Sequence, residues 1–189
     1  MTATATRARI QNAALKLFVT KGIAETTTRD LARKARIAEG TIYRHYESKD
    51  ALIQDLFESH FTAFSKALEQ AQAEAGAAFD EKLKAMIGYM CRLYDSDPTL
   101  YRFLLLVQHA ALPRLTPAKR GPLAVLRDVL TEAIRRKEIP TQDVRLSAAM
   151  IMGAVIQPAL ALIYGSLEGR MGKFAPSICN ACRRIAHAR

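Results

Sequence analysis

The sequence predicts an all-α protein, and three observations support this expectation. Apolar residues recur every three to four positions in long alanine- and leucine-rich segments, as they do on one face of a helix. Seven prolines and nine glycines fall mostly between those segments, where they end helices. No β-branched run alternates for long enough to indicate a strand. A chain of 189 residues also buries an adequate core without disulfides or metals.

The first two expected helices are separated by a short turn. A helix over about residues 5–21 carries apolar side chains at the i, i+3, i+4 and i+7 spacing of an amphipathic helix, and Gly22 supplies left-handed backbone to end it. Thr27 and Asp30 have the spacing of a capping box, with Asp in place of the usual Glu. This box predicts the start of a second helix, which ends near Ala35.

The remaining elements follow the same logic. A third short helix is expected over residues 39–46, and Ser48 is placed to cap a fourth. One apolar stripe then runs through residues 49–74, which predicts a single long helix. Pro and Gly punctuate the later helices, which are expected over about residues 81–94, 99–112, 122–137, 141–164 and 175–188.

The net charge of +10 is unevenly distributed. Residues 1–50 carry 10 Lys and Arg against 5 Asp and Glu, residues 170–189 carry 5 against none, and residues 51–169 carry 13 of each. Lys and Arg displace counterions from phosphate backbones, so a basic segment on a neutral body indicates a polyanion-binding head. Solubility alone is the alternative explanation of this charge.

Two features bear on localisation. The N-terminal residues MTATATRARIQ lack the apolar stretch of a secretory signal, so we expect a cytoplasmic protein whose three cysteines are reduced. Residues 146–167 contain no charge and are long enough for a transmembrane helix. Because Pro158, Gln157 and two glycines interrupt this run, we favour a buried or interface helix over a membrane span.

The third helix has an apolar back and a polar front. On a wheel of 100° per residue, Ile42 and Tyr46 share the core face, and Tyr43 and His45 project to the two flanks. The residues that point away from the core are Gly40, Thr41 and Arg44. Such a helix suits the DNA major groove, where the front contacts base edges and the flanks contact phosphates. The alternative is a solvated helix whose Tyr and His are merely exposed.

The N-terminal stretch resembles the TetR (tetracycline-repressor-like) family of bacterial transcription regulators. The matching segments are ALKLF at residues 14–18, then Gly22, then TTTRDLARKA, then IAEGTIYRHYESKDAL. The resemblance covers residues 8–57, about a quarter of the chain. It implies an all-α homodimer with an N-terminal helix-turn-helix head, here residues 1–50. It also implies a divergent domain, here residues 51–189, that binds a small effector and dimerises.

Carried over by position, the resemblance assigns DNA contacts to individual residues. Thr27 caps the second helix, and Arg29, Tyr43, His45 and Lys49 contact the phosphate backbone. The residues that face the bases are Glu39, Gly40, Thr41 and Arg44.

Two positions depart from the family pattern, and a third needs explanation. Arg36 stands where the turn usually has Gly, which places a non-Gly residue in strained left-handed backbone. Ala38 stands where a Ser or Thr cap is common, at a cost of about 1 kcal/mol. Glu39 repels phosphates, so it tolerates DNA only by meeting a cytosine amino group or by staying outside the groove.

Other chemistry has weaker support in the sequence. Cys179 and Cys182 form a C-x-x-C that raises a redox or metal site, but two small packed interface residues explain it more simply. No H-x-x-x-H, phosphate-binding glycine loop or nucleophile motif is present. We therefore expect no enzyme activity, no metal and no cofactor.

A mostly apolar effector pocket is expected in the second domain. Small-molecule sites combine apolar walls with a few polar groups, and a plain helical core is the alternative explanation of the same residues. The candidate lining residues are Phe64, Met86, Tyr89, Met90, Phe103, Val107, Gln108, His109, Met150 and Gln157. No acidic residue clearly faces this interior, which favours a neutral or anionic effector.

The sequence as a whole predicts a cytoplasmic DNA-binding regulator. We expect a repressor that leaves a palindromic operator when a small apolar effector binds, and a homodimer formed through about residues 141–164 and 175–188. Two alternatives remain open: a ligand-independent dimeric DNA-binding protein, and a redox-sensing regulator that uses Cys179 and Cys182.

Overall fold

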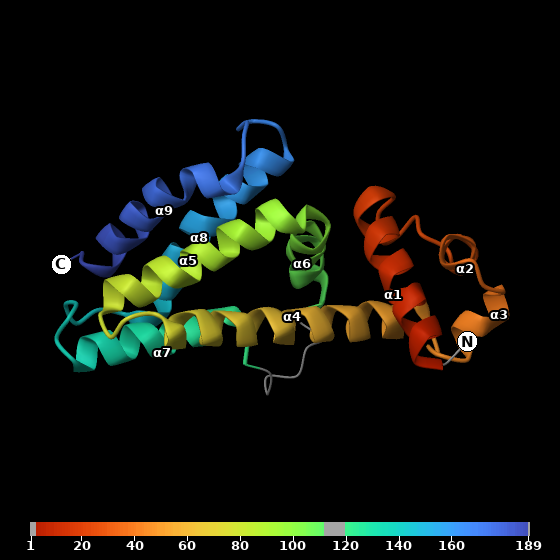
Figure 1. The fold of residues 1–189 in the computed structure, drawn as a ribbon, viewed down its shortest axis with the longest axis horizontal. Coiled ribbons are helices and arrows are strands. Elements are labelled where there is room, and N and C mark those ends of the chain that lie inside the picture. Colours follow the sequence, from red (N-terminus) through yellow and green to blue (C-terminus); the bar gives the residue numbers. More distant parts are fainter. Residues whose placement is uncertain (1–2, 112–119, 189) are drawn as a thin grey trace. The chain divides into compact units, whose positions relative to one another are not determined.

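The computed structural model describes residues 3–111 and 120–188, with the helical backbone alone between 106 and 111. The described residues form helices and turns without any strand, which confirms the expected fold class (Figure 1). The helices are α1 (Ala3–Thr20), α2 (Thr28–Ala35), α3 (Glu39–Tyr43), α4 (Lys49–Glu74), α5 (Phe79–Ser96), α6 (Pro98–Ala111), α7 (Pro122–Arg135), α8 (Val144–Ile163) and α9 (Met171–Ala186).

The chain packs into two compact units. The N-terminal unit contains the chain up to His60 together with α6 from Thr99, and the C-terminal unit contains Phe61–Pro98 and the helices from α7 onward. Helix α4 is continuous across the boundary. The expected functional division at residue 50 stays a prediction, because packing alone does not assign a function to either part.

The core of the N-terminal unit explains why its short helices form. Helices α1, α2 and α3 contact one another in sequence order, and each turns an apolar face inward. The rings of Phe18 and Phe103 stack with their centroids 6.3 Å apart, which brings α6 against α1. The largest fully buried aliphatic side chains of this unit are Ile10, Leu31, Leu52 and Leu56. Burial of this size stabilises the unit by roughly 1.5–3 kcal/mol per large side chain.

The C-terminal unit is a bundle of longer helices. Helix α9 packs along α5 and α8, and α8 packs along α7. Apolar side chains fill the space between them, including Met86, Ile87, Leu126, Leu130 and Ile151. Asp95 reaches from α5 to the start of α9, where its carboxylate accepts hydrogen bonds from the backbone N–H groups of Met171 and Gly172 at 2.8 and 2.9 Å. That contact starts α9 four residues earlier than the sequence predicted.

Candidate nucleic-acid interface and pocket

Helix α2 is fixed at its start by the predicted capping box. The Thr27 hydroxyl accepts from the backbone N–H of Asp30 at 3.1 Å, and the Asp30 carboxylate accepts from the backbone N–H of Thr27 at 3.0 Å. Lys21 also donates to this carboxylate. Lys21 and Thr27 together hold the pKa of Asp30 well below its usual range. Thr27 is therefore placed as a cap, as the sequence predicted.

Helix α3 begins without a side-chain cap, because Ala38 has no oxygen to offer. Glu39 turns back to α2 instead: its carboxylate accepts from the Thr28 hydroxyl at 2.8 Å and lies 3.8 Å from the Arg29 guanidinium. The Tyr43 hydroxyl in turn donates to the Thr28 oxygen at 3.4 Å. This chain of contacts ties the two short helices together and gives the Glu39 carboxylate two partners on α2.

The front of α3 is open and polar. Gly40 is exposed, and a Cβ added there would meet no atom within 4 Å. The exposed Arg44 guanidinium donates to the Thr41 hydroxyl at 3.0 Å, and Tyr43 is 54% exposed. His45 is half-buried on the flank. The structure therefore brings the predicted base-facing and flanking residues together on one surface.

The helix itself is shorter than predicted, since α3 ends at Tyr43 rather than at residue 46. The Ile42 carbonyl accepts from the backbone N–H groups of both His45 and Tyr46, each at 2.9 Å. A carbonyl shared in this way tightens the last turn, and such tightening is common at helix ends.

Lys49 has partners that the sequence did not reveal. Its ammonium group donates to the backbone carbonyls of Ile23 and Thr26 at 3.0 and 3.1 Å, and to that of Ala24 at 3.4 Å. These carbonyls belong to the loop between α1 and α2. Lys49 thus holds this loop against the start of α4, while its contact with phosphate stays a prediction.

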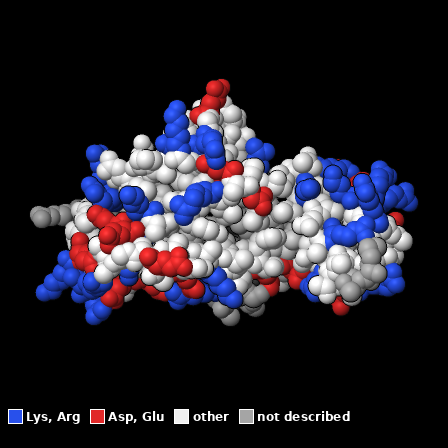
Figure 2. Space-filling view, in the orientation of Figure 1, with Lys and Arg blue, Asp and Glu red and all other residues white. Residues whose placement is uncertain are grey.

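Positive charge gathers on the N-terminal unit (Figure 2). Beyond Arg29 and Arg44, the exposed basic residues around α2 include Arg33, Lys34 and Arg36. Arg33 lies one helical turn after Arg29, so the two share a flank of α2. Sequence reasoning named Arg29 alone, although this i, i+4 spacing was available as a signal.

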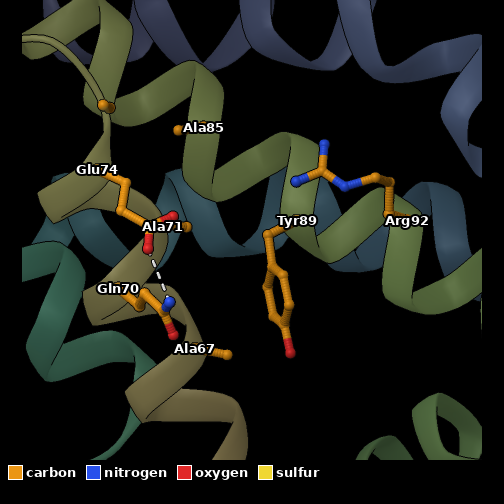
Figure 3. Close-up of a pocket in the computed structure, with 8 residues that line it drawn as sticks. Ala67, Gln70, Ala71, Glu74, Ala85, Tyr89 and Arg92 are labelled. Atoms are coloured by element: carbon orange, nitrogen blue, oxygen red, sulfur yellow. Dashed lines mark hydrogen bonds between the residues drawn. The ribbon is translucent and has the colours of Figure 1, made fainter.

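A pocket of about 370 Å³ lies between the C-terminal half of α4 and α5 (Figure 3). Its walls are lined by Ala67, Gln70, Ala71, Glu74, Ala75, Ala85, Tyr89 and Arg92. Gln70 donates to Glu74 at 2.7 Å, and the Tyr89 ring projects into the space beside α4. Burial raises the pKa of Tyr89, so its hydroxyl stays protonated and can donate a hydrogen bond. Four alanines and four polar residues line the pocket, so it suits a ligand with both an aliphatic and a polar part. The Glu74 carboxylate corrects the expectation that no acidic residue faces the effector site.

The predicted effector residues divide into several groups. Tyr89 lines this pocket, and the Phe64 ring stacks on it with centroids 5.9 Å apart. Met86 and Met90 are buried on α5, whereas Phe103 packs in the N-terminal unit. Met150 and Gln157 lie on the exposed face of α8. The side chains of Val107, Gln108 and His109 lie outside the described residues. The structure therefore does not gather the predicted set into one cavity, and its role in binding an effector stays a prediction.

Helix α8 exposes an apolar face. Leu146 is 58% and Met150 is 48% exposed, and a Cβ at the exposed Gly153 would meet no atom within 4 Å. In the part of the chain that the structure describes, this helix is the one whose length and hydropathy would allow it to cross a membrane. Its opposite face is buried in the bundle through Ile151 and Val155.

The three cysteines are free and lie on α5 and α9. Burial raises the pKa of the Cys91 thiol to about 11 and that of Cys182 to about 12, and it also raises the pKa of Cys179. Reactive cysteines have lowered thiol pKa values, so these three have the character of packed residues. Within the described ranges, no three His, Cys, Asp or Glu side chains cluster to hold a metal ion.

Comparison with known proteins gives matches over both short and long stretches. Residues 10–56 match the family model of bacterial regulatory proteins, tetR family. The fatty acid metabolism regulator protein of Bacillus subtilis is 28% identical over 152 residues, which are 78% of each chain. The uncharacterized HTH-type transcriptional regulator YvkB of the same organism is 38% identical over 69 residues. That match spans 36% of each chain, so the chain covers about a third of the length of YvkB.

Solved structures share the fold along nearly the whole chain. FadR of Bacillus subtilis, in complex with stearoyl-CoA, superposes with a TM-score of 0.77 at 22% identity and covers 96% of this chain and 98% of its own. A TetR family transcription regulator of Marinobacter aquaeolei reaches a TM-score of 0.81 at 18% identity, covering 97% and 96%. The TM-scores establish a shared fold, and at identities this low they establish the fold alone.

Proposed function

The chain belongs to the TetR family of bacterial regulatory proteins, and from this premise we propose that it is a cytoplasmic, dimeric DNA-binding repressor without enzyme activity. The observation that supports the proposal most strongly is the exposed front of α3. Gly40, Thr41 and Arg44 lie together on this front, where Arg44 donates to Thr41, while Glu39 is tied back to α2. A Glu39 carboxylate held against α2 would direct its charge away from the bases of the major groove.

The proposed DNA contacts divide by type. Arg44 and Thr41 face base edges, with Gly40 allowing close approach and Glu39 at the rim. Arg29, Tyr43, His45 and Lys49 serve the phosphate backbone, with Thr27 holding the start of α2. A second copy of the chain, joined through the exposed face of α8 and through α9, would present two such fronts to a palindromic operator.

In-vitro selection from random DNA tests this proposal directly. The expected product is a palindrome whose half-sites lie about one helical turn apart, about 10 base pairs. Affinity for it should fall steeply with rising salt, since phosphate contacts release counterions. Recovery of no enriched sequence by the purified protein would contradict the proposal.

The effector is proposed to be an anionic amphiphile of the acyl-CoA class. The B. subtilis relative is named for fatty acid metabolism, and the FadR structure holds stearoyl-CoA. In this chain, the alanines of the pocket offer apolar contact, Tyr89 and Arg92 offer donors for an anion, and the Glu74 carboxylate at the same pocket already accepts from Gln70. Ligand entry would displace α4 from α5, and α4 leads to the N-terminal unit, so the spacing of the two α3 fronts would change.

A thermal-shift and operator-release experiment checks the effector. Stearoyl-CoA should raise the melting temperature and release operator DNA, whereas the lipophilic cation tetraphenylphosphonium should do neither, because Arg92 repels a cation and the Glu74 carboxylate is already paired with Gln70. Ala71→Phe would fill the pocket and abolish the response, and Ala73→Phe, exposed on the same helix, is the matched control. Selective stabilisation by the cation would overturn the assigned ligand class.

A further inference from the structure

Three side chains of the N-terminal unit meet around one carboxylate, that of Asp55 on α4. It accepts hydrogen bonds from the Arg7 guanidinium at 2.8 Å, the Tyr46 hydroxyl at 2.9 Å and the Gln11 amide at 3.0 Å. Arg7 and Gln11 belong to α1, and Tyr46 belongs to the turn that closes α3. This cluster, here called the Asp55 cluster, joins three elements through one group.

The Tyr46 hydroxyl both donates and accepts a hydrogen bond. The hydroxyl donates to Asp55 and accepts from the Arg7 Nε at 3.1 Å, and the Arg7 guanidinium also lies 5.4 Å from the centroid of the Tyr46 ring. Tyr46 is only 5% exposed, and its backbone N–H binds the carbonyl of Ile42 in α3. The backbone of Tyr46 therefore completes the last turn of α3, and its side chain is held by residues of α1 and α4.

The charges of the Asp55 cluster fix the direction of each hydrogen bond. Burial raises the pKa of Asp55, but hydrogen bonds from Arg7, Tyr46 and Gln11 outweigh it and hold that pKa below its usual range. Asp55 and Tyr46 raise the pKa of Arg7, and burial raises the pKa of Tyr46. At neutral pH the carboxylate is charged and the phenol is protonated, so Tyr46 must donate to Asp55 and accept from Arg7.

We propose that Asp55 and Arg7 are positioning residues for DNA recognition, acting through the Tyr46 hydroxyl on the orientation of α3. This inference rests on the proposed function. Apolar contacts through Ile42 hold α3 in place but tolerate sliding, because dispersion and burial are not directional. Two hydrogen bonds to one hydroxyl restrict its position to a few tenths of an ångström. Base readout requires that restriction, whereas phosphate contacts tolerate its loss.

Tyr46→Phe tests the proposal with the smallest possible change. The ring and the charges stay, and the hydroxyl alone is removed. Affinity for the selected operator should fall about tenfold, because a hydrogen bond to a charged group is lost on each side of the hydroxyl. Affinity for random DNA and the salt dependence should stay within about twofold of wild type, because every phosphate contact remains. A merely structural role would leave the ratio of operator to random affinity unchanged in folded protein.

Matched variants distinguish the loss of a negative charge from the loss of the Asp55 cluster. Asp55→Asn should lower the same ratio and should be non-additive with Tyr46→Phe, since both act in one network. Asp128→Asn removes an equal charge from the ion pair with Arg120 in the C-terminal unit, and should leave the ratio unchanged. If Tyr46→Phe does not fold by circular dichroism, Gln11→Ala replaces it, with a fall of about threefold expected for one weaker hydrogen bond.

These experiments distinguish failure of the positioning role from failure of the proposed DNA-binding function. Wild-type protein that enriches no DNA sequence would defeat the proposed function itself. Wild-type protein that binds a palindrome, with folded variants that keep its full specificity ratio, would overturn the positioning role alone. A fall in operator and random affinity by the same factor would also overturn it.

Discussion

Both units have an apolar core, and they differ in how far each also depends on polar side chains. In the N-terminal unit, polar side chains reach across to backbone groups: Arg9 donates to the carbonyls of Ala35 and Arg36, and Lys49 donates to those of Ile23 and Thr26. In the C-terminal unit, longer helices pack along one another through apolar side chains, and polar contacts to the backbone, such as that of Asp95, lie at helix ends. The difference follows from helix length, because every helix end leaves about four backbone groups without partners.

Short helices therefore demand specific residues, and long helices do not. Helices α2 and α3 have 8 and 5 residues, so most of their backbone groups lie near an end. Each needs a partner of defined type and reach. A buried position in α5 or α8 accepts many apolar side chains of suitable volume. The family match over residues 10–56 includes both short helices, whereas the fold similarity extends over 97% of the chain.

The largest expected effect concerns the C-terminal unit, where the apolar face of α8 stays exposed in a single chain. Met150→Asp should shift the protein from dimer to monomer at micromolar concentration, because a buried unpaired carboxylate costs several kcal/mol. Light scattering measures the mass. Leu123→Asp is the matched control, since Leu123 is also an exposed apolar residue, 38% accessible, but lies on α7. A Met150→Asp protein that remains dimeric would remove α8 from the interface.

The next effect concerns the polar front of the N-terminal unit. Arg44→Ala should reduce discrimination between the selected operator and a half-site mutant by about 1–3 kcal/mol, the worth of one good base contact. Fluorescence anisotropy with both DNAs measures it. Arg127→Ala, an equal charge change on α7, should leave discrimination intact. Equal discrimination by Arg44→Ala and wild type would show that this side chain does not face a base.

Lys49 offers a direct test of the contrast between the units. Lys49→Ala leaves the loop carbonyls without their donor, so the free energy of unfolding should fall by about 1–3 kcal/mol. Urea denaturation measures the change. Lys66→Ala, exposed on the same α4 helix, should change stability by less than about 0.5 kcal/mol. If the two variants unfold alike, water replaces the ammonium at no cost, and Lys49 is free for phosphate.

Local signals made much of the N-terminal unit predictable. The capping box of Thr27 and Asp30 and the cap from Ser48 to the N–H of Ala51 depend on neighbours within a few residues, whereas the left-handed Arg36 was expected from the family pattern. Each is confirmed. Such signals fix local backbone without any knowledge of tertiary contacts.

Contacts between distant residues set the limit of prediction. The start of α9 was missed because its cap, Asp95, lies 76 residues before Met171. Phe103 was placed in a pocket because the sequence does not show that α6 packs with the N-terminal unit. Met150 shared an apolar pattern with pocket candidates, but α8 is apolar on most sides and its rotation cannot be read from periodicity. The Asp55 cluster was not predicted because its members Arg7 and Gln11 lie more than 40 residues before Asp55 in the sequence.

The smallest expected effect concerns a turn at the end of a helix that occurs in both units. After α2, the N–H groups of Ile37 and Arg36 bind the carbonyls of Ala32 and Arg33, and Arg36 has φ 55°. After α7, the N–H groups of Glu138 and Lys137 repeat this pattern, with φ 59° at Lys137. Gly165 occupies the same position after α8, with φ 74°. This hydrogen-bond pattern is the Schellman motif, in which Gly avoids the steric cost of left-handed backbone.

Arg36→Gly and Lys137→Gly should therefore each raise the free energy of unfolding by up to about 1 kcal/mol. The gain is reduced because Gly also gives the unfolded chain more freedom. Gly165→Ala should lower stability by a similar amount, which urea denaturation resolves. Equal gains would show that turn energetics are local and independent of how a unit is held together. A gain at Lys137 without one at Arg36 would show that Arg9, which holds the carbonyls of Ala35 and Arg36, already compensates the strain in the N-terminal unit. Arg36→Gly should also weaken binding to random DNA slightly, since it removes one exposed charge beside α3.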